Sequence, residues 1–133
     1  MKIEEIRIND VYKCKVDDDN VARKVIEINN KGDLVLSKVR GDSWETLDAT
    51  IQDIVPVEIS EQSLKAIGAI KSPFGVEFML MAGDKEFYIK KDINSSLWLC
   101  ARLHKYRPPF AKVRFIHELQ RYLLDTYMTT LSL

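Results

Sequence analysis

The sequence has little of what catalytic, metal-binding or disulfide-stabilised domains need. Its 133 residues include two cysteines, two histidines and five glycines. Cys14 and Cys100 stand at alternating positions of apparent strands, which predicts two buried thiols rather than a disulfide framework. The cysteines, His104 and His117 lack the spacing of metal ligands, and the glycines form neither a phosphate-binding loop nor a nucleophile elbow. We therefore predict no catalytic, cofactor or metal site.

Long hydrophobic runs are also missing. No apolar run approaches the roughly 18 to 20 residues that a membrane span needs, so we expect no membrane association. Met1-Lys2-Ile3-Glu4-Glu5 is acidic, whereas a secretory signal has a basic start and an apolar stretch. A chain with 46% hydrophobic and 30% charged residues has an ordinary globular composition. We expect a cytoplasmic protein.

Acidic residues are absent from one stretch, residues 93–117, although the formal charge of the whole chain is zero. The same stretch holds cations and aromatic rings: Arg102, Lys105, Arg107, Lys112 and Arg114, with Trp98, Tyr106, Phe110 and Phe115. Residues 1–60 carry a net charge of −4 (nine basic, thirteen acidic) and residues 61–133 a net charge of +4 (eleven basic, seven acidic). An anionic partner should therefore meet the C-terminal half.

The first half of the chain has the pattern of short strands joined by polar turns. Apolar residues alternate with polar ones over 12–16, 21–28, 34–39 and 44–51. We interpret Asp17-Asp18-Asp19-Asn20 as a solvated hairpin turn, because it lacks the glycine and the glutamate of a helical calcium loop. Pro56 makes 54–59 an edge strand or an extended connector. Residues 1–58 are predicted to form a bent antiparallel sheet, or an SH3-like barrel.

The second half, residues 59–133, has the pattern of a short helix, a three-stranded meander and a long helix. Ser60 is a suitable N-cap, Ile59 can pack against Leu64, and the helix should end before Ser72-Pro73. Three alternating segments follow, over about 76–80, 87–90 and 97–103. A meander with one buried face needs a cover, and the last helix supplies it.

The last helix is predicted from apolar residues at helical spacing: Val113, Ile116, Leu119, Leu123 and Tyr127, widened by Phe115, Tyr122 and Leu124. On its polar side Arg114 and Glu118 are four residues apart and can pair. We predict a single α+β domain in which the two subdomains pack together.

Basic and aromatic side chains alternate over residues 98–114. Cations neutralise phosphates and aromatic rings stack on bases, so this stretch is a candidate nucleic-acid surface. The candidate residues are Lys105, Tyr106, Arg107, Lys112 and Arg114. Against this interpretation, Arg102 lies on a predicted strand and Phe115 faces the predicted core. The sequence therefore favours an ordinary solvated surface or a protein-contact surface over a nucleic-acid surface for this stretch.

Three segments occur in a suggestive order: Ile6-Arg7-Ile8-Asn9-Asp10-Val11, then Ile54-Val55-Pro56-Val57-Glu58-Ile59-Ser60-Glu61, then Phe115-Ile116-His117-Glu118-Leu119-Gln120. They resemble the "LRIGN", "PIPLTEE" and "YVHQLQNLY" motifs of small uncharacterised proteins encoded by prophages and mobile elements of Bacteroidetes. The resemblance implies a phage or mobile-element accessory protein of a bacterial cytoplasm and carries over no catalytic residue. His117 and Gln120 match the helix motif and could anchor the helix to the meander.

These patterns together favour a non-enzymatic binding module that acts as an adaptor or inhibitor of a protein partner. Two alternatives stay open: a nucleic-acid-binding module that uses residues 98–114, and a virion or self-assembling structural protein. The sequence does not determine the oligomeric state.

Overall fold

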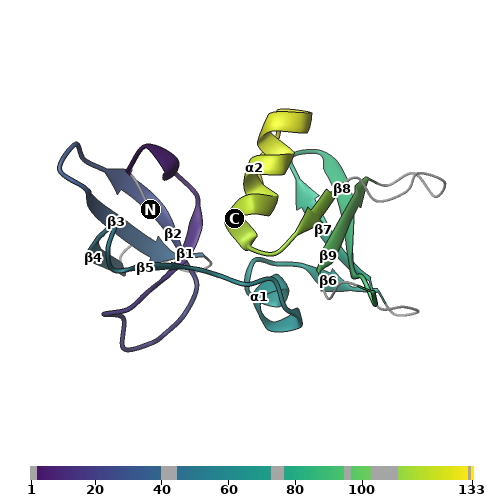
Figure 1. The fold of residues 1–133 in the computed structure, drawn as a ribbon, viewed down its shortest axis with the longest axis horizontal. Helices are drawn as coiled ribbons and strands as arrows, with labels where there is room; N and C mark the ends of the chain where they lie inside the picture. The colour runs from purple at the N-terminus through teal and green to yellow at the C-terminus, as the bar shows by residue number, and fades with distance from the viewer. Residues whose placement is uncertain (1–2, 40–44, 73–76, 95–96, 103–110, 132) are drawn as a thin grey trace. The chain divides into compact units, whose positions relative to one another are not determined.

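The structure, a computed structural model, describes residues 3–39, 45–72, 77–94, 97–102, 111–131 and 133. The chain divides into two compact units, Met1–Val57 (unit 1) and Glu58–Leu133 (unit 2). Within the described residues each unit holds one antiparallel sheet, and both α-helices belong to unit 2 (Figure 1). The predicted α+β class is confirmed. None of the helices in these ranges is long and apolar enough to cross a membrane.

Unit 1 begins with a 3-10 turn, η1 (Ile3–Glu5), and continues with strands β1 (Val11–Cys14), β2 (Arg23–Ile28), β3 (Asp33–Lys38), β4 (Thr46–Thr50) and β5 (Ile54–Pro56). In the described part of the unit the strand order is β4-β3-β2-β1-β5. The first four strands form a meander, and β5 returns to pair with β1. Pro56 therefore lies on an edge strand, where its missing N–H costs no ladder hydrogen bond.

The core of unit 1 is made by the alternate residues of these strands together with Ile6. Its buried members include Ile6, Tyr12, Cys14, Val25, Leu34, Leu36, Ala49 and Ile54. The Tyr12 hydroxyl is completely buried and donates to Asp10 Oδ2 at 3.1 Å. Since a buried hydroxyl without a partner is costly, Asp10 allows a tyrosine to occupy this core.

The Asp17 turn differs from its sequence-based interpretation. Asp18 and Asp19 are exposed, but the Asp17 side chain is 4% exposed and faces the buried Arg23. Arg23 Nε donates to Asp17 Oδ2 at 2.7 Å, and Arg23 Nη2 donates to Asp17 Oδ1 at 3.2 Å. These hydrogen bonds hold the pKa of Asp17 below its usual value. The turn is thus fixed by a two-point ion pair rather than simply solvated.

Unit 2 contains α1 (Glu61–Ala66), β6 (Ile70–Lys71), β7 (Phe78–Ala82), β8 (Lys85–Lys91), β9 (Trp98–Arg102), β10 (Ala111–Val113) and α2 (Ile116–Tyr127). Among the described residues the strand order is β10-β9-β8-β7-β6. Strands β7, β8 and β9 are the predicted meander. The edge strands β6 and β10 were not predicted, because two or three residues are too short to show an alternating pattern.

Helix α1 begins where the sequence predicts. Ser60 Oγ accepts the Ser63 N–H at 3.1 Å, and Ser63 Oγ accepts the Ser60 N–H at 2.8 Å. This reciprocal capping box satisfies two backbone donors that the helix leaves unpaired. The flanking Ile59 and Leu64 are both buried, as a hydrophobic staple requires. The helix is shorter than expected and is followed by Gly68, whose φ of 96° is a left-handed conformation that suits glycine.

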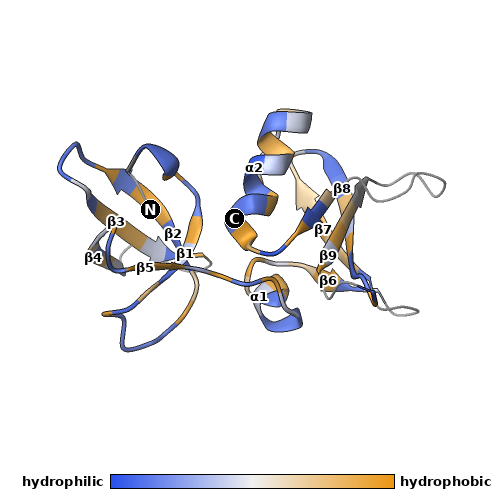
Figure 2. Cartoon of the chain, in the orientation of Figure 1, coloured by the Kyte–Doolittle hydropathy of each residue, from blue (hydrophilic) through white to orange (hydrophobic). Residues whose placement is uncertain are grey.

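Helix α2 covers one face of the sheet of unit 2. Its residues Ile116, Leu119 and Leu123 are fully buried, and alternate sheet residues such as Phe78 and Phe87 are buried with them. Figure 2 shows that β7 is hydrophobic along its whole length, whereas β8 has hydrophilic residues on both sides of its hydrophobic centre. Trp98, one of the aromatic residues of the basic stretch, is buried and packs edge-on against Phe78, at 6.0 Å between ring centroids.

Three details of the predicted last helix are wrong. Val113 belongs to β10, because the helix starts only at Ile116. Leu124 does not widen the buried stripe and is 37% exposed. Glu118 accepts the Phe115 N–H at 3.1 Å and caps the helix, so it is not the partner of Arg114. Arg114 instead reaches Glu58, which is distant in sequence.

Candidate functional site

The predicted basic and aromatic surface is only partly described by the structure. Lys105, Tyr106 and Arg107 lie outside the described residues. Lys112 is exposed on β10, and its Nζ lies 3.5 Å from Asp92 Oδ2. Arg114 donates to Glu58 Oε1 at 3.0 Å and lies over the Phe115 ring at 5.1 Å from the centroid. Both described cations are therefore already next to a carboxylate, which weakens the attraction of this surface for phosphates.

The two residues proposed to anchor the last helix lie in its first turns. His117 is buried, and its ring stacks on that of Phe115 at 5.7 Å between centroids. Gln120 is half-buried. A packing role fits both positions, and neither lines the groove described next.

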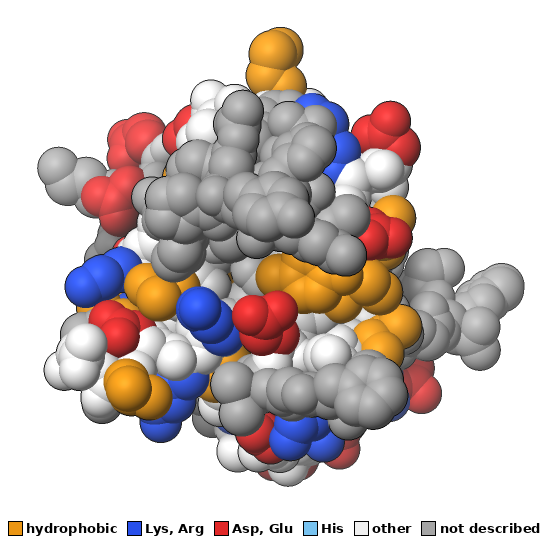
Figure 3. Space-filling view, turned by 90° about the vertical axis from the view of Figure 1, so that its right-hand side faces the viewer, with side chains coloured by type: hydrophobic (Ala, Val, Ile, Leu, Met, Phe, Trp, Pro, Cys, Tyr) orange, Lys and Arg blue, Asp and Glu red, His pale blue; other side chains and the backbone are white. Residues whose placement is uncertain are grey.

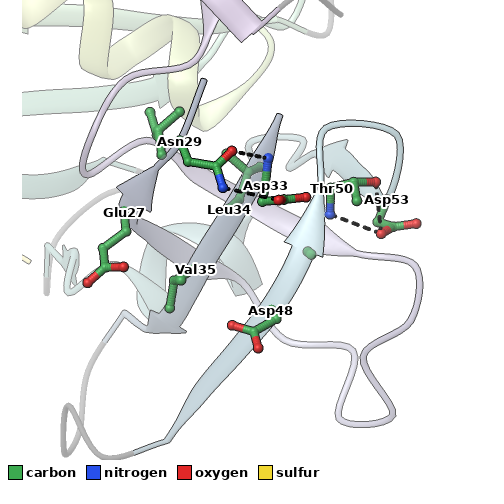
Figure 4. Close-up of a pocket in the computed structure, with 10 residues that line it drawn as sticks. Glu27, Asn29, Asp33, Leu34, Val35, Asp48, Thr50 and Asp53 are labelled. Carbon is green, nitrogen blue, oxygen red and sulfur yellow. Dashed lines mark hydrogen bonds between the residues drawn. The ribbon is translucent and has the colours of Figure 1, made fainter. Parts of the chain in front are cut away.

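A groove of about 490 Å³ opens on the sheet of unit 1. We name it the carboxylate groove. It is lined by residues of β2, β3, β4 and the adjoining turns: Glu27, Ile28, Asn29, Asp33, Leu34, Val35, Asp48, Ala49, Thr50 and Asp53. Four of these residues carry carboxylates and none is basic. Figure 4 shows Glu27 and Asp48 projecting on either side of Val35.

Register explains why Glu27 and Asp48 share a face. Val35 on β3 pairs with Glu27 on β2 and with Asp48 on β4, so the three residues form one row across the strands. The register of β2 shifts between Val25 and Glu27. Without this bulge Glu27 would point to the same side as the buried Val25, because side chains alternate with period two. The bulge therefore turns a carboxylate out of the core and into the groove.

Two turns fix the upper end of the groove. Asn29 Oδ1 accepts the N–H groups of Lys31 at 2.9 Å and of Asp33 at 3.0 Å, and Asn29 Nδ2 donates to Asp33 Oδ2 at 3.0 Å. On the other side, Asp53 Oδ2 accepts from Thr50 N at 3.0 Å and from Thr50 Oγ1 at 3.1 Å (Figure 4). Such side-chain to backbone bonds are what make Asn and Asp favourable in turns. They hold two of the four carboxylates in fixed positions.

Neither cysteine lines the carboxylate groove. Across the described ranges, no group of three or more His, Cys, Asp or Glu side chains is arranged to hold a metal ion. Cys14 and Cys100 are free and buried, as predicted. Burial raises the pKa of the Cys100 thiol to about 12, so it is protonated and unreactive at neutral pH.

Sequence reasoning directed attention to the wrong half of the chain for this groove. The only signal was the net charge of −4 over residues 1–60. That charge says nothing about which carboxylates meet, because the meeting depends on strand register and on one bulge. Comparison with known proteins adds no assignment: no family model, curated protein or solved structure matches the chain.

Proposed function

We propose that the protein is a non-enzymatic binding module whose unit 1 holds a basic, extended segment of a protein partner in the carboxylate groove. The observation that carries this proposal is the composition of the groove. The lining contains four carboxylates and the apolar residues Val35, Leu34 and Ala49, and no basic residue. A cationic ligand is the complement of such a surface.

The apolar floor favours lysine and arginine side chains over a small inorganic cation. Their aliphatic stems can lie along Val35 while the charged ends reach Glu27 and Asp48. Asp33 and Asp53 continue the acidic lining past the first row, which suits a ligand with more than one positive charge. An extended peptide segment offers such charges at regular spacing.

We also infer that the strands of unit 1 form a small SH3-like barrel. The strand order β4-β3-β2-β1-β5, with the last strand returning to the first, supports this inference. Small barrels of this kind bind their partners through loops and exposed strand faces, because the inner face of the sheet forms the core. The carboxylate groove occupies such a face.

An adaptor or inhibitor in the cytoplasm of a phage-bearing bacterium remains our biological proposal. It rests on the resemblance of three sequence segments to mobile-element proteins. Both the mobile-element context and the composition of the groove fit a protein that binds a partner and does not catalyse a reaction.

The test is fluorescence anisotropy of the whole protein with labelled peptides, one rich in lysine and arginine, one acidic and one neutral, over a salt series. The basic peptide should bind, and salt should weaken its binding because the attraction is electrostatic. The double variant Glu27→Lys, Asp48→Lys should lower affinity by about tenfold or more, since like charges then face the ligand. The matched control, Glu4→Lys with Asp18→Lys, makes the same charge change at exposed positions outside the groove lining.

Equal loss in the control and groove variants would reduce the effect to net charge and overturn the proposal. A parallel titration with short single- and double-stranded DNA and RNA addresses the predicted nucleic-acid surface. Binding of nucleic acid that is lost in Lys112→Ala with Arg114→Ala, without any binding of basic peptide, would favour that alternative instead.

A further inference from the structure

The sheet of unit 2 has a second face, opposite to the face that α2 covers. Alternate residues of β6 to β9 point to this outer face, and several of them are apolar: Ile70, Met79, Met81, Tyr88 and Leu99. Ile70 is 62% exposed and Met81 is 39% exposed, while the other three are half-buried. Figure 3 views this side of the molecule, where hydrophobic side chains gather next to acidic and basic ones.

The strand register places three of these side chains in one line. Ile70 on β6 pairs with Met79 on β7, and Met79 pairs with Tyr88 on β8. We name Ile70, Met79 and Tyr88 the apolar row. The solvent-facing side of an antiparallel sheet normally carries polar residues, so an apolar row that begins at the exposed Ile70 is typical of a contact surface.

The charges beside the row have opposite signs. On β8, Glu86 precedes Tyr88 by two residues and Lys90 follows it by two, so all three point to the same face. Each charge lies about 7 Å along the strand from Tyr88. Tyr88 is thus the midpoint between a negative and a positive side chain.

We propose that a second copy of the chain packs face to face on this surface, with a two-fold axis running along the apolar row. Such an axis reverses the direction along β8 while it keeps Tyr88 in place. Glu86 then lies over Lys90 of the second copy, Lys90 lies over Glu86 of the second copy, and the two Tyr88 rings meet at the centre. Two-fold contacts are self-complementary, and facing sheets lie about 10 Å apart, a gap that Tyr and Met side chains fill.

The charge pattern favours this axis over an axis that runs parallel to the strands. An axis parallel to the strands would place Glu86 over Glu86 and Lys90 over Lys90 of the second copy. Like charges directly opposed across an interface are unfavourable, whereas the first arrangement forms two complementary pairs. The proposal is independent of the carboxylate groove, because it concerns the other unit and another partner.

The test is sedimentation equilibrium of the full chain over a concentration series. The wild type should show the mass of two chains at high concentration. Glu86→Lys alone and Lys90→Glu alone should each weaken dimerisation by at least about tenfold, because each variant opposes like charges twice. An equimolar mixture of the two single variants should recover a dimer of nearly wild-type affinity, since one copy then offers two cations and the other two anions.

The mixture also shows that the single variants fold, because an unfolded chain would not recover a dimer. The double variant Glu86→Lys, Lys90→Glu should dimerise as the wild type does. As a control, Glu4→Lys and Lys31→Glu make the same charge changes at exposed positions of unit 1 and should leave the association unchanged. A wild type that stays monomeric throughout, single variants that dimerise normally, or a mixture without recovery would each overturn the proposal.

Discussion

The two units cover the buried faces of their sheets in different ways. Each is an antiparallel sheet of short strands with one buried face, and a buried face needs a cover. Unit 1, which has no α-helix among its described residues, brings β5 back to β1 and adds Ile6 to its core. Unit 2 keeps its strands in simple meander order and lays α2 over the buried face.

The cover that each unit uses leaves a different surface for partners. The free face in unit 1 carries the carboxylate groove, which suits a cationic ligand. The outer face of the unit 2 sheet carries the apolar row with Glu86 and Lys90 on either side of Tyr88, which suits a second copy of the chain. The chain can thus present two kinds of contact surface, because only one face of each sheet packs into a core.

The largest expected effect comes from shortening a fully buried core side chain in either unit. Leu36→Ala in unit 1 and Leu119→Ala in unit 2 each delete a side chain that is 0% exposed. Each should lower the free energy of unfolding by about 2–5 kcal/mol, because lost burial adds to the cost of the cavity. Hydrogen exchange followed by mass spectrometry should show faster exchange in the strands of the substituted unit, β1–β4 or β7–β9.

The control for this pair is Leu124→Ala, which removes the same side chain from an exposed position of α2 and should change stability by about 0.5 kcal/mol or less. Faster exchange throughout both units after either core substitution would mean that the two cores unfold together. That result would support the predicted packing of the subdomains and weaken the contrast between them.

A smaller effect is expected at the ion pair that fixes the β1–β2 turn of unit 1. Asp17→Asn keeps the shape of the side chain but removes the charge that Arg23 meets at 2.7 Å. The loss at neutral pH should be about 2 kcal/mol, the range of hydrogen bonds to charged groups. Urea unfolding curves of the variant and the wild type at pH 7 measure it.

The pH dependence of this pair has a definite sign. Hydrogen bonding by Arg23 holds the pKa of Asp17 in the folded protein below the ordinary value of 3.8. The folded state therefore binds fewer protons than the unfolded state near that value, and the stabilisation is present in full above it. It disappears as the pH falls below 3.8, so wild type and Asp17→Asn should converge in acid. Asp18→Asn, at the exposed neighbour, should follow the wild type at every pH, and a gap that persists in acid would contradict this assignment.

Local features of the chain were predictable from sequence, and pairings between distant segments were not. The Ser60 cap depends on residues three apart, and the apolar side of α2 depends on helical spacing. Both could therefore be predicted from the sequence alone. The partnership of Arg114 with Glu58 joins residues far apart in the chain. The carboxylate groove likewise depends on which residues of β2, β3 and β4 stand side by side.

The β2 bulge shows most clearly why the groove could not be found. Period-two alternation from Val25 predicts that Glu27 points to the buried side of the sheet. A buried glutamate counts against a strand at this position, so the alternation does not predict a surface carboxylate. The shifted register turns Glu27 outward opposite Val35. Whether a strand bulges is decided by the pairing of the whole strand, which no local pattern reports.

The smallest expected effect compares one turn glycine from each unit. Gly32 and Gly83 both have positive φ, 88° and 63°, so alanine is strained at either position by about 1 kcal/mol. A Cβ at Gly32 would lie 3.9 Å from Ile51 Cγ2, an ordinary contact, whereas a Cβ at Gly83 would lie 2.8 Å from Thr129 Oγ1. Leu131 pairs with Ala82 and holds the segment after α2 close to this turn.

Gly83→Ala should therefore destabilise the protein more than Gly32→Ala does, by about 1 kcal/mol beyond the shared backbone cost. The double variant Gly83→Ala, Thr129→Ala removes the crowding oxygen and should return to the cost of Gly32→Ala, after correction for Thr129→Ala alone. Urea unfolding of the four variants and the wild type gives these differences as a double-mutant cycle. A coupling free energy of zero between positions 83 and 129 would mean that the segment after α2 moves away from the β7–β8 turn at no cost. The buried face of the unit 2 sheet would then be covered by α2 alone.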